Sequence, residues 1–270
     1  AYWRYIFSLS GLKSILAIFG IIWLIVETLD FFNVYTKDKY GAYAFFIFII
    51  LSILISILLK RPIKSITIPF PEHDFTIEVC IADLFNLSGA TMISTNTIFE
   101  ADVAGNKIAV DSLQGQFTAK YYTGNQIELI NKINDELQKL DTNPPYPFGT
   151  TVPIHTHGKT FYFTAMSKLG EGGNASSSVS EIQASLIGLW DYVGKKGELI
   201  ELVIPVIGTG RGRVKISRKK MIALIAESFT KASVQFKFSN KLIIAIRPQD
   251  AENFGINLYD IKDHLNHVLK

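Results

Sequence analysis

Residues 202–213 read LVIPVIGTGRGR, an apolar, β-branched run that passes into a glycine-rich turn, and a helical pattern begins near Ser217. Short apolar runs of this kind are typical of buried central strands in α/β sheets. Glycines let the backbone turn sharply and bring bare N–H groups close to a ligand, and at the start of a helix such groups suit phosphate oxygens. The stretch is either a phosphate-binding turn or an ordinary strand-to-helix turn. The guanidinium groups of Arg211 and Arg213 favour the first.

Strands and helices alternate on both sides of this stretch. Apolar alternation and turn residues predict strands at 65–68, 75–82, 91–96, 108–110, 150–154, 160–166 and 241–246. Helical spacing of apolar residues predicts helices at 126–140, 180–193, 217–232 and 256–269. Such alternation predicts an α/β fold, in which helices cover both faces of a sheet.

The N-terminal part of the chain has the composition of a membrane segment. Residues 42–59 contain no charge, glycine or proline and match the length of a bilayer crossing, about 20 residues. The earlier apolar run, 14–26, becomes a second span if Lys13 snorkels and residues 28–35 complete it, and a cleaved signal peptide is the alternative. We expect two antiparallel spans in residues 1–64 and a separate domain in residues 65–270.

Basic residues flank the two expected spans. Residues 1–64 carry seven Lys/Arg and three Asp/Glu, a net charge of +4, whereas residues 65–270 carry twenty and twenty-one, a net charge of −1. The basic pI therefore reflects the membrane flanks and not a nucleic-acid-binding face. The distribution of lysine and arginine favours both ends in the cytoplasm, which predicts a two-span protein of the bacterial inner membrane with its large domain in the cytoplasm.

The acidic side chains inside the expected spans have two possible roles. Glu27 and Asp30 are three residues apart on one helix face, and either lie at the outer headgroup level or line a polar path when several hairpins assemble. Ser52 and Ser56 share a face of the second span and suit helix packing.

No metal or nucleophile chemistry is evident in the sequence. The lone Cys80 lies in an apolar alternation, which indicates a buried structural thiol. His155 and His157 face the same side of a strand, but no third ligand is evident nearby. They therefore indicate a solvent-exposed turn and not a metal site. We expect no metal and no cofactor.

Polar residues at the ends of predicted strands form the candidate site. Asp83, Asn96 and the turn 208–212 each follow a predicted strand, and ligands of open α/β sheets bind beyond the carboxyl ends of the strands. In a nucleotide sugar, the amine suits the Asp83 carboxylate, the ribose hydroxyls suit the Asn96 amide, and the diphosphate suits the free backbone N–H groups of the turn. A coincidence of polar strand ends is the alternative.

At this point residues 75–265 resemble the macro domain, the ADP-ribose-binding three-layer α/β/α fold with a mixed sheet. The resemblance rests on residues 77–84, Thr95-Asn96 and 204–210, and the more specific stretches 112–117 (SLQGQF) and 146–151 (YPFGTT) are similar to the membrane-anchored macro-domain effectors of type II Thoeris anti-phage systems.

The resemblance implies roles for particular residues. Asp83 matches the acid that contacts the adenine amine, Asn96 the amide near the distal ribose, and Phe254 a ring that stacks on adenine. Residues 208–213 match the second diphosphate loop, and residues 112–117 take the place of the first. The implied ligand-binding residues are Asp83, Leu84, Asn96, Ser112, Leu113, Gln114, Gly115, Gln116, Phe117, Gly208, Thr209, Gly210, Arg211, Gly212, Arg213 and Phe254.

The resemblance also implies a function. A partner TIR-domain enzyme makes an ADP-ribose-derived signal, histidine-ADP-ribose in this family, and the receptor then assembles into a homo-oligomer and disrupts the membrane of the infected cell. Hydrolytic macro domains have a triple glycine in the first loop, where this chain has Gln114-Gly115-Gln116, and its strand end reads Ser94-Thr95-Asn96. We therefore expect a receptor and not an enzyme. A membrane-tethered ADP-ribosyl hydrolase or ADP-ribose reader, and an anchored scaffold with an empty pocket, are the alternatives.

Overall fold

The computed structural model describes residues 9–32, 34, 41–59, 63–170, 174–208 and 214–269. The chain divides into two compact units, Ala1–Ile63 and Lys64–Lys270, which are described separately.

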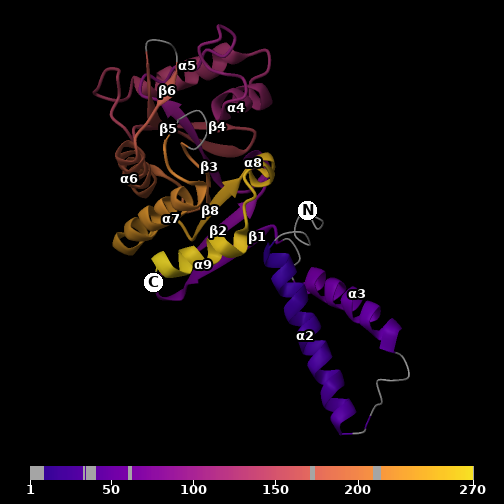
Figure 1. The fold of residues 1–270 in the computed structure, drawn as a ribbon. Coiled ribbons are helices and arrows are strands. Elements are labelled where there is room, and N and C mark those ends of the chain that lie inside the picture. The colour runs from indigo at the N-terminus through magenta and orange to yellow at the C-terminus, as the bar shows by residue number, and fades with distance from the viewer. Residues whose placement is uncertain are drawn as a thin grey trace. The chain divides into compact units, whose positions relative to one another are not determined.

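The first unit is a pair of apolar helices, α2 (Leu9–Phe31) and α3 (Gly41–Leu59) (Figure 1). They pack on each other through an edge-to-face contact of the Phe19 and Phe45 rings, with centroids 5.7 Å apart, and Ser52 and Ser56 are fully buried. Within the described residues, Gly11–Phe31 is the one helix long and apolar enough to cross a membrane, and the apolar part of α3, Tyr43–Leu59, is shorter. The second predicted span therefore stays a prediction.

The second unit is built on one mixed sheet. Its strands follow the order β1-β2-β8-β7-β3-β5-β4, and β6 pairs with β5. Strands β2, β8, β7, β3 and β5 run parallel to their neighbours in that order, while β1, β4 and β6 pair antiparallel. The strands are β1 (Ser65–Phe70), β2 (Phe75–Ile81), β3 (Ala90–Asn96), β4 (Thr151–Thr156), β5 (Lys159–Leu169), β6 (Ala175–Ser176), β7 (Leu202–Pro205) and β8 (Lys241–Ile246).

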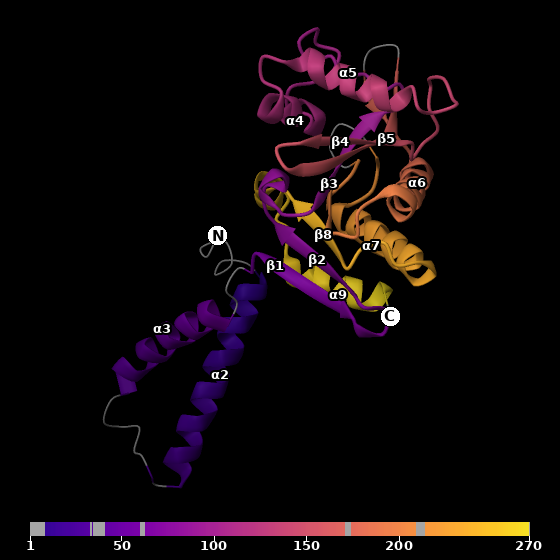
Figure 2. The ribbon, with the colours of Figure 1, turned by 180° about the vertical axis from the view of Figure 1, so that it is seen from behind.

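Helices cover both faces of this sheet. Figures 1 and 2 show α4 and α5 on one face and α6, α7 and α9 across the other. The helices are α4 (Leu113–Tyr121), α5 (Gln126–Leu137), α6 (Val179–Lys196), α7 (Arg218–Gln235), α8 (Pro248–Asn253) and α9 (Leu258–Val268), with short 3-10 helices at Pro71–His73 and Leu84–Asn86. The α/β fold with a mixed sheet is confirmed.

Each face has its own aromatic core. Under α4 and α5, the fully buried Phe117 ring contacts Phe161 and Phe163, with centroids 4.8 and 5.0 Å away. Under α6 and α7, Trp190 meets Phe229 edge-to-face at 5.5 Å. Burial of rings this large dominates core energetics, so the two cores hold the helices on the sheet.

Two sequence-based expectations about the segment after β3 are wrong. Residues 108–110 form no strand and belong to the loop 97–112, where the Ile108 N–H donates to the Asp102 carbonyl at 2.9 Å. Residues 113–121, expected in part as a ligand loop, form α4. Gly115 weakens the helical pattern in this part of the sequence. A glycine is required at this position because a Cβ atom would lie 2.3 Å from the Ala109 carbonyl oxygen.

Cys80 is buried in strand β2, as predicted, with 5% of its surface exposed. Burial and, to a smaller extent, the negative charge of Glu78 raise the pKa of its thiol from the ordinary value of 9.0 to about 11, while the positive charge of Lys241 opposes the shift. The thiolate is the reactive form, so burial protects this thiol both sterically and chemically.

We expect Cys80 in the native full-length chain to react with N-ethylmaleimide at pH 8 at least about a hundredfold more slowly than in denatured protein, since a rise of two pKa units lowers the thiolate fraction about a hundredfold. Mass spectrometry of timed samples measures the rate. The denatured chain is the control, because Cys80 is the only cysteine of the sequence. Comparable rates in both samples would contradict the burial of Cys80.

Candidate functional site

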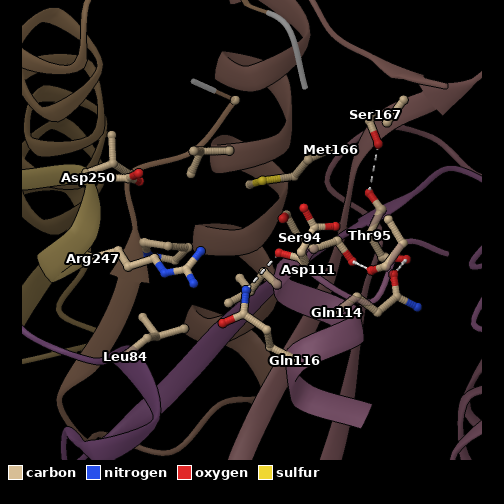
Figure 3. Close-up of a pocket in the computed structure, with 18 of the residues that line it drawn as sticks. Leu84, Ser94, Thr95, Asp111, Gln114, Gln116, Met166, Ser167, Arg247 and Asp250 are labelled. Carbon is tan, nitrogen blue, oxygen red and sulfur yellow. Dashed lines mark hydrogen bonds between the residues drawn. The ribbon is translucent and has the colours of Figure 1, made fainter. Parts of the chain in front are cut away.

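A cavity of about 980 Å³ lies at the edge of the sheet where the parallel strands end (Figure 3). Residues that follow β2, β3, β7 and β8 line it, together with the start of α4 and the end of β5. The volume is at the upper end of the range for ligand sites, about 300–1,000 Å³. The position is the one that the parallel topology predicts for a ligand.

Asp83 lies at the end of β2 and lines this cavity. Its side-chain Oδ1 accepts a hydrogen bond from the Phe85 N–H at 3.0 Å and so caps the short helix that follows. Lys159 stabilises the same turn, since its Nζ donates hydrogen bonds to the Phe85 and Leu87 carbonyls, both at 3.0 Å. Burial raises the pKa of the nearby Tyr121 hydroxyl, and the Asp83 charge raises it further. The carboxylate is therefore fixed in place while it remains exposed.

Asn96 ends strand β3 beside a register shift in its pairing with β5. Its buried side chain accepts hydrogen bonds at Oδ1 from the Ile98 and Glu100 N–H groups, both at 3.1 Å. The oxygen therefore holds the following loop in place. The Nδ2 group is what the side chain can still offer to a ligand in the cavity that Asn96 lines.

Gln114 ties three segments together beneath the cavity. Its Oε1 accepts from the Thr95 hydroxyl at 3.1 Å (Figure 3), and its Nε2 donates to the Glu100 carbonyl at 2.8 Å. Only 3% of the residue is exposed. A buried amide that is satisfied at both ends positions β3, the loop and α4 relative to one another.

The segment expected as the first diphosphate loop is the cap and first turns of α4. The Ser112 hydroxyl accepts from the Gly115 N–H at 3.0 Å and donates to the Ala109 carbonyl at 2.6 Å. Gln116 extends along the cavity and donates to the Asp111 carbonyl at 2.8 Å (Figure 3). The N-terminus of a helix carries a partial positive charge, so this turn still offers an electropositive wall.

Gly208 and Leu84 also line the cavity. Gly208 has a φ of +69°, and its carbonyl accepts from the Val214 N–H at 3.0 Å, which closes the turn after β7. The predicted residues Thr209, Gly210, Arg211, Gly212 and Arg213 lie outside the described residues. The structure thus brings Asp83, Asn96 and Gly208 to one cavity from three separate strand ends.

Two aromatic residues of the predicted set do not line the cavity. Phe117 is fully buried in the core under α4 and α5, with no accessible surface. Phe254 is 58% exposed, and its ring lies against the guanidinium of Arg218, whose Cζ is 3.4 Å from the ring centroid. Arg218 lines the cavity, so Phe254 contacts a cavity-lining side chain but does not line the cavity itself.

Charged residues complete the wall, and all of them except Asp83 were missed by the sequence-based prediction. Among the described residues, four cations and three acids line the cavity, which leaves a charge of +1; they are Lys107, Lys120, Arg218 and Arg247, and Asp83, Asp111 and Asp250. Arg247 follows β8 directly and its side chain points into the cavity (Figure 3), so the strand-end rule would have found it. Arg218 is the first residue of α7, a weaker signal.

No group of three potential metal ligands exists among the described residues. His155 and His157 flank the β4–β5 turn, away from the cavity lining, and His155 Nδ1 lies 3.1 Å from the Thr160 hydroxyl.

The sequence and the fold are similar to those of known proteins. A protein named Thoeris protein ThsA from Bacillus amyloliquefaciens (strain Y2) is 24% identical over 200 residues, which cover 69% of this chain and 67% of that protein. The Oceanobacillus iheyensis macrodomain with ADP has a TM-score of 0.52 at 12% identity, over 76% of this chain and 97% of that one. A mutant of that macrodomain with ADPR has a TM-score of 0.50 at 13% identity, over 76% and 98% of the two chains. At these identities the structures show the fold alone.

The family described as "Thoeris protein ThsA, Macro domain" matches residues 77–247, which include every strand of the sheet that lines the cavity. A match over more than half of the chain shows the family, and the chain belongs to the ThsA macro-domain family of Thoeris proteins.

Proposed function

We propose that this chain is a membrane receptor that binds an ADP-ribose-derived nucleotide in the cavity at the strand ends. The observation that carries the proposal is the cavity itself: it is large, its described lining carries a charge of +1, and an acid, an amide and Gly208 line it from separate strand ends. An excess of cations suits a ligand with negative phosphates.

The parts of the ligand suit different parts of the wall. The Asp83 carboxylate accepts from an exocyclic amine, and the Nδ2 group of Asn96 donates to ribose hydroxyls. The diphosphate lies between the turn that begins at Gly208 and the electropositive start of α4. Related macrodomains with ADP and with ADPR support this class of ligand.

The proposed role is binding and not catalysis. The first turn of α4 carries Gln114 and Gln116, and the Gln114 side chain is taken up by structural hydrogen bonds. One observation favours a hydrolase as the second candidate: Asp111 and Ser94 both line the cavity (Figure 3), and a carboxylate there is a candidate general base.

The membrane part of the proposal rests on the helix pair α2 and α3. Its outward side chains are apolar, with Leu16 59%, Leu24 66% and Phe46 65% exposed, and an apolar surface this continuous suits lipid. We propose that it anchors the chain in the bacterial inner membrane through two spans, with the nucleotide-binding domain in the cytoplasm.

The signal and the outcome complete the proposal. A TIR-domain enzyme supplies the nucleotide, histidine-ADP-ribose, and its binding drives self-association that disrupts the bilayer. A ligand shifts such an equilibrium only through its differential affinity for the two states, and about 5.5 kcal/mol moves the population from 1:99 to 99:1.

We expect ADP-ribose and histidine-ADP-ribose to raise the unfolding temperature of the detergent-solubilised full-length chain, and NAD and ATP to raise it less. Asp83→Asn should weaken binding about tenfold, or about 1.4 kcal/mol, because the amide keeps the cap on the Phe85 N–H but loses the charged acceptor. Thermal shift and calorimetric titration measure both effects. Asp191→Asn, a change at an exposed carboxylate paired with Lys195, is the matched control.

Each alternative has its own result. Release of free ADP-ribose from an ADP-ribosyl ester by the purified chain would establish a hydrolase and contradict the receptor role. A wild-type chain that none of the four nucleotides stabilises would be a scaffold.

We expect Glu27→Leu combined with Asp30→Leu to abolish signal-dependent dye release from vesicles that contain the full-length chain, while the affinity for histidine-ADP-ribose is unchanged. The reason is that intramembrane carboxylates avoid lipid and line polar paths in assemblies. Thr28→Leu, which removes a hydroxyl that donates to the Leu24 carbonyl on the same helix, is the control. Unchanged release from the double variant would show that these carboxylates play no part in leakage.

A further inference from the structure

Arg218 has an unusual setting at the cavity wall. Its guanidinium lies on the Phe254 ring, with Cζ 3.4 Å from the ring centroid, and the side chain is 16% exposed. Phe254 does not line the cavity, whereas Arg218 does. A flat cation is therefore interposed between this aromatic ring and the ligand space.

Packing on the Phe254 ring helps to set the orientation of this guanidinium. Its Nε atom is buried without a hydrogen-bond partner, and within the described residues its ion pair is a long one, 3.9 Å from Nη2 to the Asp250 carboxylate. A guanidinium on a ring is held flat by cation–π attraction and stacking. The orientation of Arg218 therefore depends on Phe254.

Other flat groups at the wall are less suited to receive a base. Phe85 is the one aromatic residue among the described lining residues, and only 7% of it is exposed. Its ring meets Tyr121 edge-to-face at 5.9 Å, and the Lys120 ammonium lies 5.4 Å from its centroid. Arg247 is exposed, and no ring backs it within the described residues. Arg218 is therefore the cavity-lining guanidinium that packs on an aromatic ring.

Arg218 also lies at the correct end of the cavity for a base. Strand β2, which leads to Asp83, is the neighbour of β8, which leads to Asp250 in α8. Asp250 is the residue that approaches Arg218. Asn96, by contrast, follows β3, two strands further along the sheet. The acid that accepts an exocyclic amine and the stacked guanidinium are therefore on the same side.

We propose that the purine base of the ligand stacks on the face of the Arg218 guanidinium opposite Phe254, so that Phe254, Arg218 and the base form a three-layer stack. The donors of a guanidinium lie in its plane, and its faces are suited to π systems. Nucleobases stack on arginine in this way in other proteins. The inference rests on the proposed function and assigns the stacking role to Arg218 in place of Phe254.

The test uses calorimetric titration of the detergent-solubilised full-length chain with ADP-ribose, at about 0.1 M and about 1 M salt, where screening lengths are about 10 and 3 Å. Arg218→Lys keeps the charge and removes the flat group, and we expect affinity to fall about tenfold or more at both salt concentrations. Phe254→Leu keeps the arginine and removes its support, and we expect a loss of about threefold or more, although Phe254 does not reach the cavity.

Matched controls isolate the stack. Lys219→Met removes a neighbouring exposed charge of α7, and Tyr259→Leu removes an exposed aromatic side chain near the C-terminus; neither residue lines the cavity. Both should bind ADP-ribose within about twofold of wild type. Thermal unfolding of each variant without ligand shows whether it is folded, and Phe254→Leu keeps the test decisive if Arg218→Lys is unfolded.

Several results would overturn the stack. Wild-type affinity in Arg218→Lys or in Phe254→Leu would do so, as would a loss that disappears at high salt, which indicates an ion pair with phosphate. A loss in Arg247→Lys without one in Arg218→Lys would move the base to Arg247. If the wild-type chain binds no nucleotide, the proposed function fails and the stack fails with it; if wild type binds and Arg218→Lys binds equally, the stack alone fails.

Discussion

The parallel run of the five strands β2, β8, β7, β3 and β5 is the constraint on which the site depends. Parallel neighbours end at the same edge of a sheet, so the residues that follow them meet there however far apart they are in sequence. Asp83, Asn96, Gly208 and Arg247 span more than half of the chain and line one cavity for this reason. Antiparallel pairing of the same strands would have sent alternate ends to opposite edges.

The loops at this edge are held by hydrogen bonds from side chains to backbone. Asp83 and Asn96 each accept from N–H groups of the residues that follow them, and Lys159 and Gln114 bond to loop carbonyls. A loop that is ordered before binding loses less conformational entropy when the ligand arrives. Asp83, Asn96 and Gln114 therefore line the cavity and also hold its wall in place, so their substitution affects both roles.

Phe254 has the position in the sequence that the family resemblance assigns to a stacking ring, but it does not line the cavity, whereas Arg218 does. The ring is present at the expected place after the last strand, but a guanidinium from α7 covers it on the cavity side. Nothing in the sequence near Phe254 indicates this, because the covering residue is more than thirty positions away. Tertiary packing thus places a cation, and not the ring, among the residues that line the cavity.

Local patterns in the sequence were enough for much of this protein. Apolar runs and alternation located every strand of the sheet except the two-residue β6, with β8 at its observed bounds, and helical spacing located α5, α6, α7 and α9, because these patterns follow directly from the periodicity of each element. The strand-end rule identified Asp83, Asn96 and Gly208 before any coordinates. The helix α4 was hidden by Gly115, which is explained only by the loop backbone that crosses it.

Contacts between distant segments were decided by the tertiary structure alone. The burial of Phe117 in the core, the Thr95–Gln114–Glu100 hydrogen bonds and the placement of Arg218 and Arg247 at the cavity depend on how helices pack on the sheet. Periodicity shows which face of an element is apolar, but it does not show which residue of another element lies opposite. The sequence by itself determined the elements and the edge of the sheet where the cavity lies, and packing decided which side chains line that cavity.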